Sequence, residues 1–259
     1  MKTTMKVAIT TLSSILLLGS MNFAAEAASS PAVSNLTLKT AAAKPKAENE
    51  GEKLQKEEEA RINKLLEKNP DDTYMVYVSN ELTKRKGLEV FGMGNGHPEF
   101  TAYEDYLKKA STLKEAAPQQ PVDLPDGYSF AEGKIIGPYS SEYEAEMKAE
   151  AKKLGKQIYS KKINWTHTNL IVLKYTNGED YIELMSSRLD KGDKKQKGYT
   201  YQSAKEAVKK DPKLEKQFIK NWLSWNEQGK GFSISTNPGN PLTKDELIKL
   251  AKTMVLSNK

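Results

Sequence analysis

One short turn constrains the fold of this 259-residue chain more than any other feature. Asn177-Gly178 separates two runs of alternating apolar residues, at positions 169–176 and 179–187. Asn-Gly between such runs is the strongest short-range signal of a β-hairpin. With Asn177 and Gly178 at the centre of the turn, one face of the hairpin is apolar and the other is wetter. The pairs expected on the apolar face are Leu173 with Ile182 and Ile171 with Leu184.

A second hairpin is predicted around Gln228-Gly229. This turn brings matching side chains together at three independent positions. The expected pairs are Trp225 with Phe232, Leu223 with Ile234, and the opposite charges Glu227 and Lys230. Four further segments have the composition of strands. They are Thr73–Ser79, Leu88–Phe91, Tyr128–Ile136 and Ile158–Thr166.

Helices are predicted between and after these strands, because a capping residue is followed three positions later by Glu at several points. The expected capping boxes are Thr101 with Glu104, Ser141 with Glu144, Ser203 with Glu206 and Thr243 with Glu246. A polar helix is expected over residues 51–69, and Gly155 is expected to end the helix that starts near Ser141. Short strands with appended helices predict an α+β fold: an antiparallel sheet built from hairpins, with amphipathic helices packed on one face.

The start of the chain has the three-part layout of a secretory signal peptide. Two lysines precede an uncharged stretch at residues 7–25, and Ala25 and Ala27 form a small-x-small recognition site for signal peptidase. The alternative is an uncleaved anchor, since the stretch approaches the length that spans a bilayer. The expected organisation is a signal peptide at 1–27, a disordered tether at 28–50, an N-terminal helical and short-strand region at 51–116 and a C-terminal α+β domain at 117–259.

Composition narrows the range of partners. The chain has no cysteine, which excludes disulfide scaffolds and thiol chemistry. It has 40 Lys and Arg against 34 Asp and Glu, and a cation outside the cytoplasm meets anionic wall polymers and lipid headgroups rather than nucleic acid. Ten lysines against five acidic residues lie between Asp190 and Lys220. We expect either a solvated surface or a wall-binding patch that includes Lys194, Lys195 and Lys197.

Trp222 is the other candidate binding residue. The register of the second hairpin places it on the opposite face from Trp225, together with Ser224, Ser233 and Ser235. It is therefore either covered by a helix as part of a core or exposed as an aromatic platform for a ligand.

The sequence contains no recognisable catalytic constellation. The glycine-rich run Gly92–Gly96 is followed by His97 and Pro98 rather than by a helix, so we interpret it as a flexible turn and not as a nucleotide loop. His97 and His167 are the only histidines, and neither lies in a hydrolase or metal motif. No cofactor, metal or catalytic residue is therefore predicted. A hydrolase that uses distant paired carboxylates stays open as an alternative.

From about Pro70 onward the chain resembles a family of Bacillus-type extracytoplasmic proteins. The residues that carry the resemblance are Leu124–Phe130, Tyr175–Gly178, Trp225 with Gly229, Phe232 and Ile234, and Leu242–Ala251. These proteins share a C-terminal domain of unknown function, which also occurs in some anti-sigma-factor-like and sporulation-associated membrane proteins. The resemblance implies a secreted or surface-exposed module without a known reaction.

We therefore expect a secreted or cell-wall-associated protein of a Gram-positive envelope, with no stable membrane span after cleavage. Its expected role is a non-enzymatic binding or regulatory module that engages an envelope protein or an anionic wall polymer. A structural protein held to the wall by its lysines is the main alternative, because charge alone attracts such polymers.

Overall fold

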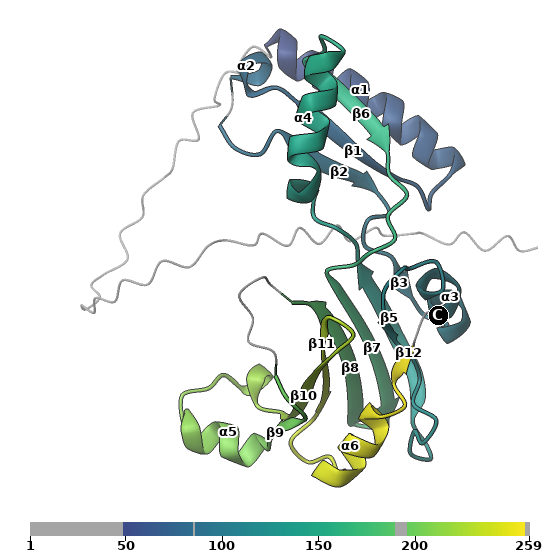
Figure 1. Cartoon of the computed structure of the whole chain (residues 1–259), viewed down its shortest axis with the longest axis vertical. Coiled ribbons are helices and arrows are strands. Elements are labelled where there is room, and N and C mark those ends of the chain that lie inside the picture. The colour runs from purple at the N-terminus through teal and green to yellow at the C-terminus, as the bar shows by residue number, and fades with distance from the viewer. Residues whose placement is uncertain (1–48, 85, 190–195, 257–259) are drawn as a thin grey trace, which may run out of the picture. The chain divides into compact units, whose positions relative to one another are not determined.

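The computed structural model describes residues 49–84, 86–189 and 196–256 (Figure 1). Within these ranges it contains six α-helices, an antiparallel sheet of three strands, one of seven strands and a short two-stranded pair. The predicted α+β class is therefore confirmed. The predicted signal peptide and almost all of the predicted tether lie outside the described residues; Asn49 caps the first helix, which begins at Glu50.

The three-stranded sheet has the strand order β2-β1-β6 and is covered on both faces. Its strands are β1 (Thr73–Val78), β2 (Val90–Gly94) and β6 (Ile158–Lys162). Successive side chains of β1 point to opposite faces. Val76 and Val78 pack beneath α1 (Glu50–Lys68), whereas Met75 and Tyr77 pack beneath α4 (Glu144–Lys153). The short helix α2 (Asn80–Thr83) and the 3-10 turn η1 (Ser140–Tyr143) complete this part.

The seven-stranded sheet has the order β3-β5-β7-β8-β11-β10-β9. Its strands are β3 (Glu99–Phe100), β5 (Ser129–Ile136), β7 (Leu170–Asn177), β8 (Asp180–Arg188), β9 (Thr200–Gln202), β10 (Asn221–Glu227) and β11 (Lys230–Thr236). One face of the sheet forms the main core with α3 (Tyr103–Ala110) and α6 (Lys244–Ala251). The helices packed on this face agree with the prediction (Figure 1). The remaining elements are β4 (Ala117–Pro118), α5 (Ala204–Lys210), η2 (Lys216–Phe218) and β12 (Val255–Leu256).

The first predicted hairpin exists, but its predicted register is wrong by two residues. Leu173 pairs with Leu184 and Asn177 pairs with Asp180, so the central turn residues are Gly178 and Glu179. Gly178 has φ +60° and Glu179 does not have positive φ, as in a type II′ turn, where glycine takes the first central position. Because side chains alternate with period two, a shift of two residues leaves the apolar face unchanged.

The second hairpin has the predicted register at all three positions. Gln228 and Gly229 both have positive φ, at 49° and 77°, which is the backbone of a type I′ turn. The pairing of Glu227 with Lys230 is also as predicted, but the two charges do not form an ion pair. The Lys230 ammonium instead lies 2.6 Å from the Glu115 carboxylate.

Two of the four predicted capping boxes are correct. Ser203 with Glu206 and Thr243 with Glu246 cap α5 and α6. The box at Thr101 is wrong, because pairing of Phe100 with Gly133 keeps the chain extended and the helix begins only at Tyr103. The box at Ser141 is also wrong, since Glu142 accepts the hydrogen bond from the Tyr139 backbone nitrogen and a 3-10 turn precedes the helix. The predicted helix end at Gly155 is correct, with φ +64°.

Residues on both sides of position 117 contribute to each sheet, so the sheets do not divide the chain at the predicted boundary. Strand β6 pairs with β1 in the small sheet, and β3 pairs with β5 in the large one. The glycine-rich run was also predicted incorrectly as a flexible turn: Gly92 and Gly94 belong to β2 and lie opposite Met75 and Thr73.

Candidate functional site

The structure describes two of the six residues that the sequence analysis proposed for signal-peptidase recognition or for ligand binding. Ala25, Ala27, Lys194 and Lys195 lie outside the described residues. Lys197 is exposed just before β9, and Trp222 lies near the start of β10.

Trp222 is half-buried on the face of the large sheet that α3 and α6 do not cover. It pairs with Ser235 on one side and Gln202 on the other, while its neighbour Leu223 points into the main core. A groove of about 590 Å³ opens beside its ring. The groove is lined by Gln202, Ala207, Lys210, Asp211, Leu214, Phe218, Lys220 and Trp222. Trp222 is thus neither fully covered nor fully exposed.

The groove exists because the chain between β9 and β10 is tied back to the sheet. Asn221 accepts a hydrogen bond from the Ala204 backbone nitrogen at 3.0 Å, which fixes the start of α5. Its amide nitrogen donates to the Thr236 hydroxyl at 3.1 Å, which links that point to β11. Helix α5 ends at Lys210, and the chain then returns through η2, so Phe218 and Lys220 come back alongside Trp222.

The groove combines aromatic surface with positive charge. The Lys220 ammonium lies 4.6 Å from the centre of the Trp222 ring, within the range of a cation–π contact, and 3.8 Å from the Glu183 carboxylate. The Phe218 ring is 56% exposed at the rim. Residues 197–220 contain seven lysines against three acids, and Asp211 is the only carboxylate among the described lining residues. Such a surface suits a ligand that has both rings and negative charge.

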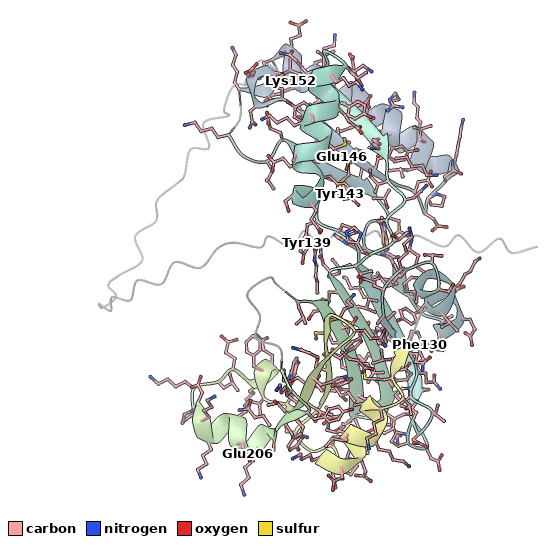
Figure 2. The ribbon with its side chains drawn as sticks, in the orientation of Figure 1. Phe130, Tyr139, Tyr143, Glu146, Lys152 and Glu206 are labelled. Carbon is pink, nitrogen blue, oxygen red and sulfur yellow. The ribbon has the colours of Figure 1, made fainter. Side chains whose placement is uncertain are left out.

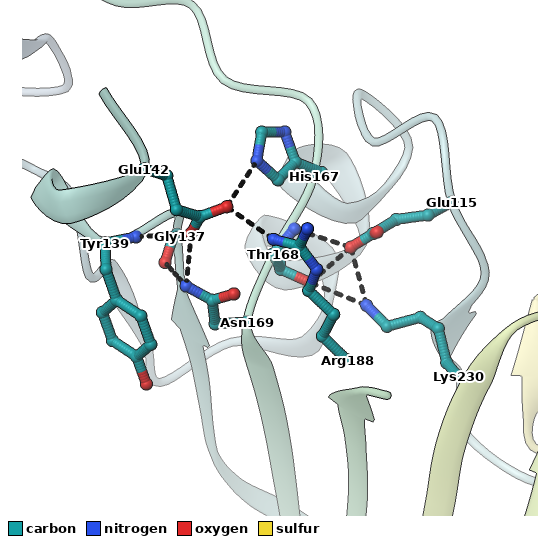
Figure 3. A network of polar contacts seen from close by, with 9 residues as sticks. All are labelled: Glu115, Gly137, Tyr139, Glu142, His167, Thr168, Asn169, Arg188 and Lys230. Carbon is teal, nitrogen blue, oxygen red and sulfur yellow. Dashed lines mark hydrogen bonds and ion pairs between the residues drawn. The ribbon is translucent and has the colours of Figure 1, made fainter. Parts of the chain in front are cut away.

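A second cluster of polar groups joins η1 to the strand ends of the large sheet (Figure 3). The Glu142 carboxylate accepts hydrogen bonds from the Asn169 amide and the Tyr139 backbone, both at 2.9 Å, and from Arg188 at 2.5 Å. His167 lies 3.6 Å from the same carboxylate. Burial raises the pKa of Glu142, but the hydrogen bonds and the charge of Arg188 outweigh it and hold this pKa below its ordinary value.

An ion pair between Lys230 and Glu115 lies next to this cluster and is more deeply buried. Lys230 is 4% exposed, and its ammonium contacts the Glu115 carboxylate at 2.6 Å and the Thr168 hydroxyl at 2.9 Å (Figure 3). Thr168 in turn donates to Glu115. A buried lysine needs such partners, because an unpaired buried charge is very costly. We interpret this cluster as structural.

Sequence reasoning did not find the partners in either polar cluster or the contact between Lys220 and Trp222. Glu115, Thr168 and Lys230 come from separate loops and strands, and no local spacing connects them. The alternation along β10 did provide one usable signal, since Lys220 and Trp222 are two residues apart and two-residue spacing places side chains on one face of a strand.

The described residues contain no group of three or more histidine and acidic side chains arranged to hold a metal ion. Nor does any helix in these ranges have the length and apolar character needed to cross a membrane. Comparisons with known protein families, with curated proteins and with solved structures found no match for the chain. The fold and the groove therefore define its class: an α+β protein with a basic, aromatic groove on a sheet face.

Proposed function

We propose that this protein is an exported, non-enzymatic binding module and that the groove beside Trp222 binds an anionic polymer of the cell envelope. The observation that carries the proposal is the position of the Lys220 ammonium, 4.6 Å from the centre of the half-buried Trp222 ring. A polymer of sugar rings linked by phosphate has matching chemistry: its rings stack on an aromatic side chain, and its phosphates pair with lysines.

Export is supported by the sequence of residues 1–27, which has the layout of a signal peptide. The resemblance to Bacillus-type extracytoplasmic proteins forms part of the same proposal and agrees with a Gram-positive envelope. Amino-terminal sequencing of the protein recovered from culture medium or cell wall tests this step. We expect Ala28 as the first residue, and a product that stays in the cell with Met1 intact contradicts export.

Attachment by charge alone is the second candidate function. It is favoured by the net charge of +6 and by the lysines that surround the groove. Exposed charges more than about 10 Å apart are largely screened at 0.1 M salt, so this kind of binding weakens steeply as salt is added. A groove that also stacks rings on Trp222 loses only part of its affinity under the same conditions.

A hydrolase finds less support in this groove. Glycoside hydrolysis generally needs two carboxyl groups on either side of the bond that breaks. Asp211 is the only carboxylate among the described lining residues, and its side chain accepts a hydrogen bond from the Lys213 backbone at 3.0 Å.

The test is binding of the protein to a purified wall polymer of sugar rings linked by phosphate, over a range of salt concentrations. We expect Trp222→Ala to weaken binding by about tenfold or more, and the double variant Lys210→Gln with Lys220→Gln to do the same. The matched control neutralises Lys64 and Lys68 on α1. It lowers the net charge by the same amount, at positions that are far from the groove in the sequence. Equal losses in the two lysine double variants, with none in Trp222→Ala, support attachment by charge alone and contradict the proposal.

A further inference from the structure

The outer edge of β2 is the least protected strand edge among the described residues. The edge strands of the large sheet are short, with two residues in β3 and three in β9. The other edge of the small sheet, β6, has five residues and carries Lys161 and Lys162. Strand β2 also has five residues, Val-Phe-Gly-Met-Gly, with no charge and no proline. Proteins normally protect such an edge, because its free backbone groups pair readily with another strand.

The register of β1 and β2 identifies the backbone groups at this edge. Val78 donates to the Glu89 carbonyl, and Asn95 donates to the Asp72 carbonyl. Backbone groups of successive residues in an antiparallel strand point to opposite sides, and those of alternate residues point to the same side, so Phe91 and Met93 also bond toward β1. Val90 and Gly92 therefore present their N–H and C=O groups outward, where no described strand pairs with them.

A hollow of about 450 Å³ lies on the α4 side of this edge. It exists because Gly92 has no side chain beside Met75 on the face where η1 stands. Met75, opposite Gly92, lies along the hollow, and Leu88 and Tyr139 line it while being 66% and 55% exposed (Tyr139 is labelled in Figure 2). Its size falls in the range of ligand pockets, and its lining is mainly apolar with a few hydroxyl groups.

We propose that this edge binds an extended peptide, which adds to the small sheet as a strand antiparallel to β2. Residues directly opposite each other in paired strands place their side chains on the same face. The peptide residue opposite Gly92 therefore forms two backbone hydrogen bonds and directs its side chain into the hollow. Main-chain bonds of this kind provide affinity, and a pocket for one side chain provides specificity.

The positive charge near the edge of β2 indicates which charge the peptide carries. Lys84 and Lys86 are exposed before the start of β2, and neither forms an ion pair with another described residue. In an antiparallel arrangement, the part of the peptide that follows the residue in the hollow runs toward these lysines. The expected partner is thus an extended segment with an apolar residue in the hollow and acidic residues after it. This surface lies on a different sheet from the Trp222 groove, so each of the two proposals is tested independently of the other.

The test uses a short synthetic peptide with one leucine among threonines and valines, followed by two aspartates, and isotope-labelled protein. We expect the backbone amide signals of Val90 and Gly92 to shift in the NMR spectrum on titration. Gly92→Leu, which fills the hollow, is expected to weaken binding by about tenfold. Gly92→Ala is the matched control: an added Cβ there would meet only Met75, at 3.7 Å, so binding stays within about threefold.

A second peptide, N-methylated at its leucine, separates strand pairing from simple filling of the hollow. This change removes one of the two backbone hydrogen bonds and leaves the side chain intact. We expect its binding to be lost. Equal binding of the methylated peptide indicates a site for small apolar groups and overturns the proposal, as does the absence of shifts at Val90 and Gly92 with the unmethylated peptide.

Discussion

Two tyrosines in the main core show how differently buried hydroxyl groups are treated in this protein. Tyr106 and Tyr175 are both fully buried, and burial raises the pKa of each hydroxyl well above its ordinary value. The Tyr106 hydroxyl donates a hydrogen bond to the Pro118 carbonyl. The Tyr175 hydroxyl has no hydrogen-bond partner among the described residues. A buried polar group without a partner costs about 1–3 kcal/mol, so these hydroxyls affect stability in opposite directions.

Removing each hydroxyl is expected to have opposite effects. Tyr106→Phe leaves the Pro118 carbonyl without its donor and lowers the free energy of unfolding by about 1–2 kcal/mol. Tyr175→Phe removes an unsatisfied group without changing the packing of the ring against Phe130, so stability stays equal or rises by up to about 1 kcal/mol. Urea unfolding of the two variants measures the difference. A larger loss in Tyr175→Phe than in Tyr106→Phe contradicts the hydrogen-bond assignment.

At the level of single residues, the sequence predicted the face of a strand on which a side chain lies better than the residue that this side chain contacts. The face on which Trp222 lies follows from alternation along β10 and was predicted correctly. Glu115 as the partner of Lys230 was missed, because the two residues are brought together only by the tertiary fold.

At the level of elements, the two hairpins show which information a turn sequence contains. Both turns were recognised from a glycine between apolar runs. The register of the first was missed because glycine suits either the first central position of a type II′ turn or the second of a type I′ turn. Gly178 takes the first position and Gly229 takes the second. At Gln228-Gly229, the cross-strand pairs of aromatic, aliphatic and charged side chains identified the register. Around Asn177-Gly178, the branched apolar residues fit the predicted register and the observed register equally well.

The contact between η1 and β8 makes stability depend on pH through Glu142. The folded protein holds the pKa of Glu142 below its ordinary value of 4.5, so the stabilisation is present above that pH and is lost as pH falls through the lower folded-state pKa. We expect Glu142→Gln to lower the free energy of unfolding near pH 7 by about 1 kcal/mol, a value reduced for solvent screening of this partly exposed group.

Unfolding measured from pH 7 down to about pH 3 tests this expectation, because the range begins above the ordinary pKa of a glutamate and extends below it. The difference between Glu142→Gln and the original protein should shrink as the pH falls. The matched control is Glu132→Gln, which removes an exposed carboxylate 3.6 Å from Lys174 and should change stability by less than about 0.5 kcal/mol. A difference for Glu142→Gln that stays constant with pH contradicts a role for its charge.

At the level of the whole molecule, the fold class could be predicted but the path of the chain could not. The class follows from local signals: alternating strands, tight turns and capped helices. The chain forms β1 and β2, then builds β3 and β5 of the large sheet, and returns to add η1, α4 and β6 to the small one. Pairing of β1 with β6 joins segments distant in sequence, and nothing in either strand indicates its partner.

The most direct test of the proposed function follows the three tryptophan side chains during titration with a wall polymer of sugar rings linked by phosphate. The indole nitrogens of Trp165 and Trp225 donate within the protein to Thr73 and Glu227, at 3.2 Å each, whereas Trp222 lines the groove. We predict that its indole signal, assigned from Trp222→Phe, shifts in the NMR spectrum with saturation, while the other two stay in place. An unchanged Trp222 signal at polymer concentrations that retain the protein would contradict binding in the groove.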